Sequence, residues 1–245
     1  MISAPPIMFF ALLTVLAIFL NGFGRRTLVV VNQIALDVGV ALFCISLIGG
    51  LGVMSDPSAL GPVFGGALFG FFCGLMIKLI TSALLKDTDR GDSSQRTKPI
   101  WIRAGAVGIF SIGVLSMFEE SAGIAAFISP SAFLGVSSVA IAISFALARI
   151  DVDRIVALVD YLPVIGFVPF VWGAIEAFHA TEPSAIGPIT ATMILGLLYS
   201  YLARAMVFIA CSEETLPKRP HMADAFYSFL PIITLFVFLL VLWIS

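Results

Sequence analysis

Long apolar runs separated by short polar segments make up most of the 245-residue chain. The runs are continuous rather than alternating, and many approach or exceed the roughly 20 residues of helix that cross a bilayer core about 30 Å thick. Backbone groups in lipid must be satisfied within a helix or a closed barrel, and continuous runs favour helices. The pattern therefore predicts an all-α polytopic membrane protein.

Eight segments are expected to be transmembrane helices. The predicted spans are 5–20, 33–54, 59–85, 100–118, 130–148, 155–178, 186–211 and 225–244. The first run lacks the basic start of a secretory signal and is followed at once by Arg25 and Arg26, so we interpret it as a span.

Composition and charge exclude several functional classes. The chain is 60% hydrophobic and 11% charged, with a mean hydropathy of +1.11, which a water-soluble surface does not tolerate. Its net charge of −2, without an extended basic patch, argues against nucleic-acid binding. The cysteines Cys44, Cys73 and Cys211 lie in apolar runs without metal-ligand spacing, so we expect packing roles and no metal or cofactor.

Most basic residues lie in or beside alternate connections between the predicted spans. They are Arg25, Arg26, Lys86, Arg90, Arg96, Lys98, Arg103, Arg149, Arg154, Lys218 and Arg219. Lysine and arginine are retained on the cytoplasmic side, so these connections are predicted to be cytoplasmic and both termini periplasmic. Segment 86–99 is predicted to be a flexible cytoplasmic linker. Lys78 and Arg204 are expected to anchor the inner ends of their helices by snorkelling.

One polar loop occurs twice, as Ser55-Asp-Pro-Ser-Ala-Leu-Gly-Pro62 and as Thr181-Glu-Pro-Ser-Ala-Ile-Gly-Pro188. A shift of 126 positions superposes the two loops and aligns the first four spans with the last four. We interpret this as a duplicated four-helix unit, 1–120 and 121–245; chance similarity is the alternative. An even number of crossings makes the two repeats parallel. Pro62 and Pro188 are expected in the first turn of their helices.

A second pattern lies in the spans 155–178 and 186–211. It comprises Asp160-x-x-Pro163-x-x-Gly166 and Gly173, followed by Gly187, Pro188, Gly196 and Tyr199. In order and spacing these residues resemble the third and fourth membrane helices of the MotA/TolQ/ExbB family, and especially the MotA and PomA channel subunits of the flagellar stator. Spans 100–118 and 130–148 resemble the first two helices more weakly, so the resemblance covers about 101–211.

The resemblance implies a subunit of an ion-coupled energy-transducing complex in the bacterial inner membrane, with a proton-channel or related ion-transport activity. It implies homo- or hetero-oligomers around a single-span partner similar to MotB or ExbD. Asp160 would then line or gate the ion path, and Pro163 would act as a hinge. The alternative for Asp160 is a carboxylate at the wet boundary, near the positive end of a helix. Thr190 and Thr192 are the candidate hydroxyls of the path.

Three departures from the family pattern keep other functions open. Segment 149–154 replaces a large cytoplasmic domain, Leu197 replaces a threonine of the ion path, and Asp37 stands where the first half would carry the motif proline. A self-sufficient secondary transporter with two parallel repeats is one alternative. A non-conducting scaffold derived from the stator fold is another. No His, Ser or paired-carboxylate constellation shares a membrane depth, so an enzyme is not expected.

The other polar and small residues have simpler expected roles. Asp37 is expected to be structural. Glu119 and Glu120 are expected to be solvated at the outer surface, as is Glu176, for which an outer ion vestibule is the alternative. Several glycines are expected to allow close helix packing, namely Gly61, Gly65, Gly70, Gly166, Gly173, Gly187 and Gly196.

Overall fold

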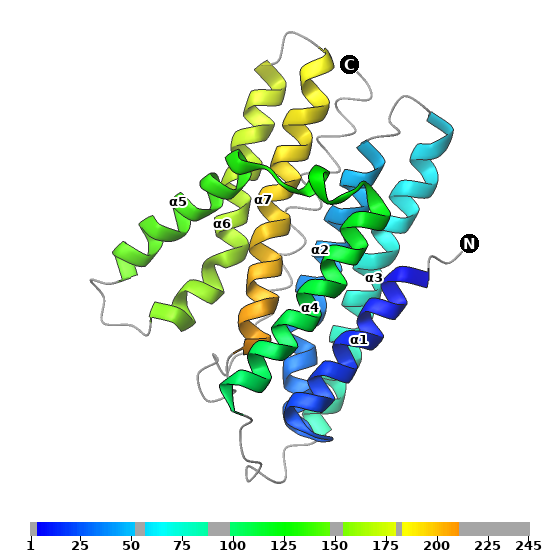
Figure 1. Ribbon diagram of the computed structural model, residues 1–245, viewed down its shortest axis with the longest axis vertical. Coiled ribbons are helices and arrows are strands. Elements are labelled where there is room, and N and C mark those ends of the chain that lie inside the picture. Colours follow the sequence, from blue (N-terminus) through cyan, green and yellow to red (C-terminus); the bar gives the residue numbers. More distant parts are fainter. Residues whose placement is uncertain (1–3, 52–56, 88–98, 148–153, 180–182, 211–245) are drawn as a thin grey trace. The chain divides into compact units, whose positions relative to one another are not determined.

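The computed structural model describes residues 4–51, 57–87, 99–147, 154–179 and 183–210, which are helical apart from short connections. The helices are α1 (Ala4–Asn21), α2 (Arg25–Leu51), α3 (Pro57–Asp87), α4 (Ile100–Ser121), the 3-10 turn η1 (Ile124–Phe127), α5 (Pro130–Leu147), α6 (Arg154–His179) and α7 (Pro183–Ala210) (Figure 1). No strand occurs in these residues, so the predicted all-α class is confirmed for them.

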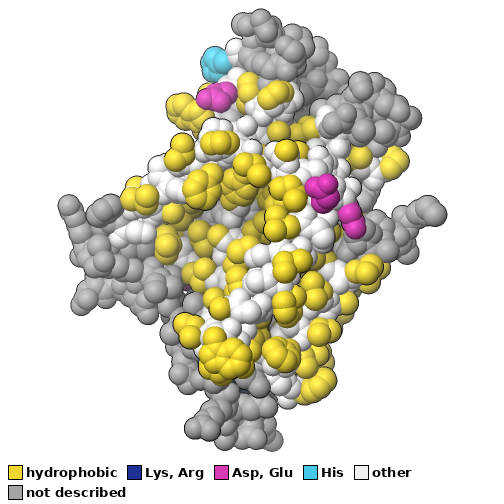
Figure 2. Space-filling model, in the orientation of Figure 1, with side chains coloured by type: hydrophobic (Ala, Val, Ile, Leu, Met, Phe, Trp, Pro, Cys, Tyr) yellow, Lys and Arg dark blue, Asp and Glu magenta, His cyan; other side chains and the backbone are white. Residues whose placement is uncertain are grey.

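Six segments in the described residues are long and apolar enough to cross a membrane. They are Arg25–Leu51, Gly61–Leu85, Ile100–Ser121, Ile124–Ser144, Leu158–Ala177 and Gly187–Ala210. The first predicted span forms α1, a shorter apolar helix. Apolar side chains are spread over the face seen in Figure 2, with acidic ones toward its margins. These helices suggest a membrane protein, while the predicted span 225–244 and most of the predicted linker lie outside the described residues.

The described residues form two compact units. Unit 1 contains residues 4–128 and 202–210, and unit 2 contains Ser129–Tyr201. In unit 1, α2 packs closely along α3 and also contacts α1, which lies beside α4 (Figure 1). In unit 2, α5 packs against α6. Helix α2 is buried on almost every side, as expected for a helix at the centre of an apolar bundle.

A glycine in the left-handed backbone region ends α1. Gly22 has a φ of 73°, and its N–H donates to the carbonyl of Ile18 at 2.7 Å. The chain reverses within residues 22–24, and α2 begins at Arg25. The predicted start of the second span at residue 33 is therefore wrong. Helix continues through this polar stretch because the hydroxyl of Thr27 bonds back to the carbonyls of Gly22 and Ala17.

Proline marks the start of both α3 and α7. Pro57 and Pro183 are the first residues of these helices, a position where a missing N–H has no intrahelical partner to lose. Pro62 and Pro188 lie inside the helices, so their expected place in the first turn is wrong. The expectation failed because each helix begins within the repeated polar loop instead of after it.

The helix bounds recur at the spacing of the repeated loops. Helix α5 begins and ends 126 positions after α1, and α7 begins 126 positions after α3. A close helix contact also occurs in each half of the chain. A Cβ on Gly39 would lie 3.1 Å from the Cα of Gly74, and a Cβ on Gly166 would lie 2.7 Å from the Cβ of Ser200. Gly74 and Ser200 are again 126 positions apart.

Close packing of α2 and α3 depends on two glycines of α3. A Cβ on Gly74 would lie 2.6 Å from the carbonyl oxygen of Ala35, and one on Gly70 would lie 3.0 Å from the Cβ of Leu42. Gly70 thus lies in this close contact. At Gly61 and Gly65 a Cβ would meet no described atom within 4 Å, and their expected packing role stays a prediction.

Replacing glycine with alanine should have different effects on stability at the tightly packed Gly74 and at the open Gly65. We expect Gly74→Ala to lower the free energy of unfolding by about 1–3 kcal/mol, because backbone atoms must move to admit the Cβ. Gly65→Ala is the matched control in the same helix and should be neutral or slightly stabilising, since alanine favours helix. Denaturant unfolding in detergent measures both; equal stability of the two variants would contradict the packing.

Candidate functional site

A buried ion pair in unit 1 joins α2 to the last residues of α7, and its two members are 167 positions apart in the sequence. Nη1 of Arg204 donates to Oδ1 of Asp37 at 3.2 Å, and the side chains are 6% and 1% exposed, respectively. The guanidinium also lies 5.4 Å from the ring centroid of Phe208. The expected role of Arg204 as a snorkelling anchor is therefore wrong, because its head group is held inside the protein by Asp37.

Burying this ion pair is energetically costly compared with burying apolar side chains. Removing a charged side chain from water costs several kcal/mol, and a buried pair recovers this only through good geometry. Apolar residues of similar volume often stabilise a protein equally well at such positions. Removing one partner alone is far more destructive, because it leaves a buried charge. The Asp37–Arg204 contact is thus favourable only while both groups are ionised.

The polar residues of α2 lead from its basic end toward this pair. At 3.6 residues per turn, Arg26, Gln33 and Asp37 fall within about 40° of arc on the helix. The Oε1 atom of Gln33 is buried and has no hydrogen-bond partner among the described residues. Beyond Gly39, α2 is apolar apart from Cys44 and Ser46. Most polar groups of α2 thus lie in its N-terminal half.

A second polar cluster lies on another side of α2. The amide nitrogen of Asn32 donates to the carbonyl of Lys78 at 2.9 Å, to Oγ1 of Thr81 at 2.9 Å and to Oγ of Ser82 at 2.6 Å. The Thr81 hydroxyl in turn bonds to the carbonyl of Ile77 at 2.7 Å. Asn32 is buried, and these contacts fix the register of α2 on α3 at the same end as the basic residues. We assign this cluster a structural role.

The residues expected to form an ion path lie in unit 2. Asp160 is exposed near the start of α6, whereas Pro163 is buried one turn later. Thr190 is buried in α7 at 2% exposure, and the hydroxyl of Thr192 donates to the carbonyl of Pro188 at 3.0 Å. Leu197, which stands at the family's threonine position, is buried.

Glycines of the resembling motif hold α6 against α7. A Cβ on Gly166 would lie 2.9 Å from the carbonyl oxygen of Gly196, and one on Gly196 would lie 3.2 Å from Pro169. A Cβ on Gly173 would lie 3.3 Å from the Cβ of Met193. These three glycines thus lie where α6 and α7 approach closely. At Gly187 a Cβ would meet no described atom within 4 Å, and its expected packing role stays a prediction.

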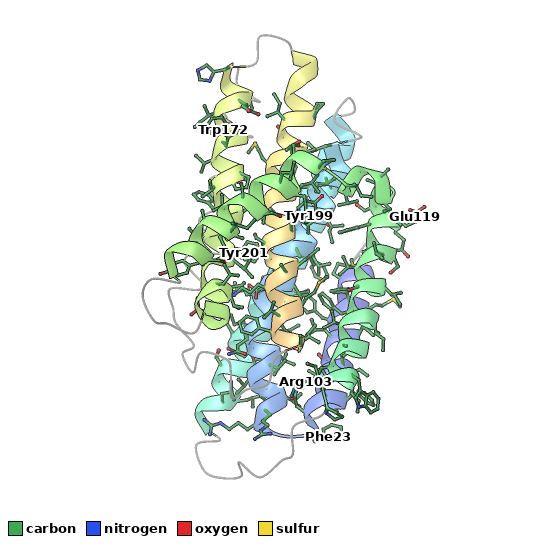
Figure 3. All side chains as sticks on the ribbon, turned by 60° about the vertical axis from the view of Figure 1, so that its left-hand side comes forward. Phe23, Arg103, Glu119, Trp172, Tyr199 and Tyr201 are labelled. Carbon is green, nitrogen blue, oxygen red and sulfur yellow. The ribbon has the colours of Figure 1, made fainter. Side chains whose placement is uncertain are left out.

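A tyrosine connects the start of α5 to α7. The backbone N–H of Ser129 donates to the hydroxyl oxygen of Tyr199 at 3.0 Å. The Tyr199 ring meets Phe133 edge-on with centroids 6.4 Å apart, and Figure 3 labels this tyrosine on α7. Tyr199 therefore fixes the beginning of α5 within unit 2.

The outer acidic residues have local partners. Oε1 of Glu176 accepts a hydrogen bond from Nε1 of Trp172 at 2.6 Å, and Oε2 of Glu119 accepts one from the N–H of Ile124 at 3.2 Å. Glu119, Glu120 and Glu176 are exposed, as expected.

The cysteines and the potential metal ligands do not form a site in the described residues. Cys44 is buried and Cys73 is half-buried, while Cys211 lies outside the described residues. No group of His, Cys, Asp and Glu within the described ranges could hold a metal ion.

Comparison with known protein families, with characterised proteins and with solved structures finds no match for this chain. The resemblance to stator subunits thus depends on the quoted motif alone.

Sequence reasoning missed the pairing of Asp37 with Arg204. The available signal was that each is a lone charge inside an apolar span, where an ionisable side chain is costly without a partner.

A double-mutant cycle should measure the coupling within the buried pair. We expect Asp37→Leu or Arg204→Met alone to lower the free energy of unfolding by about 3–5 kcal/mol, since each leaves a buried charge. The double variant should regain most of this loss. Glu119→Gln is an exposed control and should be close to neutral. Denaturant unfolding in detergent gives these values; a double variant as unstable as the sum of the single variants would contradict the coupling.

Proposed function

We propose that the protein is an integral membrane subunit of an ion-coupled energy-transducing complex of the MotA/TolQ/ExbB type, and that Asp37–Arg204 is its coupling element. The transported ion is a proton or a sodium ion. The observation that carries the proposal is the 3.2 Å ion pair inside an otherwise apolar bundle. Ionisable residues within membrane helices are costly, and they mark ion pathways and relays.

The pair supplies a physical means of coupling. A proton on Asp37, or a sodium ion competing for its carboxylate, weakens the counter-charge that holds Arg204 inside unit 1. The free-energy change for losing one partner of a buried pair is about 3–5 kcal/mol. Every 1.4 kcal/mol changes an equilibrium constant tenfold. Ion binding can therefore change the equilibrium between two positions of residues 202–210 against α2 more than a hundredfold.

Access to the pair is proposed to come from the basic end of α2. Arg26, Gln33 and Asp37 share one side of the helix, and the buried Gln33 carbonyl oxygen can bond to a water on this route. The other half of α2 offers almost no polar group. A route from one side suits a coupling element, because ion exchange with the opposite side then requires a change of conformation.

The assignment to a MotA-type subunit is supported by the helix pair α6–α7. The motif glycines Gly166 and Gly196 lie where the two helices approach closely, and small residues allow such packing of membrane helices. In the resembling family such a pair faces a single-span partner with a membrane-embedded aspartate. We therefore propose a partner of that kind, with Asp160 as an exposed carboxylate that attracts cations to the ion path.

A self-sufficient secondary transporter is the second candidate. It is favoured by two observations: both charges of the buried pair belong to the same chain, and the bounds of α1 and α5 recur at a spacing of 126 residues. Two parallel repeats of this kind can enclose a substrate site without a partner.

Ion flux through reconstituted protein tests the proposal. The chain is placed in vesicles alone and together with a co-purifying single-span protein, and internal pH and sodium are followed with fluorescent dyes after a gradient is applied. We expect flux only when the partner is present, because the complete ion path requires it. Asp37→Asn should lower the flux at least tenfold by removing the charge that the ion must neutralise. Glu176→Gln is the control carboxylate, and it should leave the flux unchanged.

The outcomes separate the candidate functions. Solute uptake by the chain alone would favour the transporter. Absence of flux and uptake in both preparations would favour the non-conducting scaffold. Equal flux in wild type and Asp37→Asn would remove the buried pair from the mechanism, even if the complex itself conducts ions.

A further inference from the structure

A hollow opens in unit 1 between α1, α2 and α3, next to the turn at residues 22–24. Its volume is about 430 Å³, within the roughly 300–1,000 Å³ typical of sites for small ligands. The walls are mainly apolar and include Ile18, Leu28, Val31 and Ile77. Arg25 and Phe23 also line the hollow. The lining of the hollow therefore combines apolar side chains with one positively charged residue.

The hollow lies at the level where a membrane surface is expected. Phe23 is 86% exposed and Trp101 is 71% exposed, and tryptophan is enriched at membrane–water boundaries. Figure 3 shows Phe23 and Arg103 toward the same end of unit 1, with Glu119 at the other end of α4. Arg25 and Arg26 follow directly after Phe23. One end of unit 1 thus combines arginines with aromatic residues.

We propose that this hollow binds one anionic glycerophospholipid of the basic-side leaflet. An acyl chain lies against Ile18, Leu28, Val31 and Ile77, and the phosphate is held by Arg25. The cytoplasmic leaflet is rich in anionic lipid, and basic pockets between membrane helices bind such head groups. The proposal requires only that the chain is embedded in a membrane, and it is independent of the proposed ion coupling.

Charge complementarity decides between this lipid and an apolar partner helix. Arg25 stands at the first position of α2, where the helix dipole disfavours a cation and favours an anion. A phosphate at this point interacts favourably with both the guanidinium and the start of the helix, whereas an apolar helix packed here would cover a charge. Thr27 is not assigned to the head group, because its hydroxyl already bonds to carbonyls of α1 and of the turn.

Lipid retention by the full-length protein tests the site. The protein is reconstituted into vesicles of phosphatidylglycerol and phosphatidylcholine in equal amounts, extracted in mild detergent and examined by native mass spectrometry. We expect one phosphatidylglycerol to be retained in preference to phosphatidylcholine. Arg25→Gln should reduce this retention about fivefold, the effect of one interfacial basic residue. Arg26→Gln is the matched control and should change retention less than twofold, since Arg26 does not line the hollow.

A second variant tests the apolar part of the site. Leu28→Trp fills the hollow without changing the charge, so retention of phosphatidylglycerol should fall although Arg25 is intact. Thermal unfolding in detergent, unchanged from wild type in each variant, shows that the fold persists. If Leu28→Trp unfolds, the comparison of Arg25→Gln with Arg26→Gln still tests the proposal. Equal retention of the two lipids in wild type, or equal losses in the two arginine variants, would overturn the proposal.

Discussion

Two opposite charges placed together inside an apolar bundle constrain most of unit 1. Asp37 and Arg204 are each intolerable in such surroundings without a counter-charge, so their 3.2 Å contact fixes the end of α7 against the middle of α2. Apolar side chains alone define the axial position of one helix on another less sharply than a directional contact does. The ion pair fixes this position because any displacement separates the charges. Geometry at this contact, more than the total buried area, specifies the arrangement of α2 and residues 202–210.

Close packing of α2 on α3 reinforces this constraint from another side. Gly74 allows the backbone of α3 to approach Ala35, two positions before Asp37, and Asn32 bonds to three groups of α3 one turn earlier. The carboxylate is thus attached to a helix whose rotation and register are both fixed. Because α2 holds Asp37 in place, a change in the charge of either group alters the attraction between them more than the position of Asp37. The proposed ion coupling requires this property.

The sequence predicts the helical class well and the site poorly. Continuous apolar runs locate the helices because burial in lipid requires little more than length and hydropathy, and the repeated loop locates the starts of α3 and α7. The start of α2 is missed because Arg25 to Asn32 looks like a polar connection, although its hydroxyl and amide groups find partners in α1 and α3. Gly65 and Gly74 look alike in sequence, yet only the second faces a neighbouring backbone.

The buried pair escapes prediction for a related reason. The apolar runs place Asp37 and Arg204 on helices. No local sequence pattern, however, shows which helices distant in the sequence pack against each other. The motif in α6 drew attention to Asp160 because it matched known spacing, while the carboxylate with the most unusual surroundings carried no motif. In this chain the physical cost of a lone charge is the better guide, and it applies to both Asp37 and Arg204 without knowledge of any relative.

The distance along the chain between the two charges has a consequence for biosynthesis. Arg204 is made 167 residues after Asp37, which at ribosomal rates corresponds to roughly 8–33 s. For most of that interval α1 and α2, joined by only three residues, have been synthesised while the arginine has not yet been translated. The nascent aspartate must therefore stay protonated, hydrated or sheltered by the insertion machinery until its arginine arrives. The order of synthesis therefore delays formation of the ion pair until the last part of the described chain has been made.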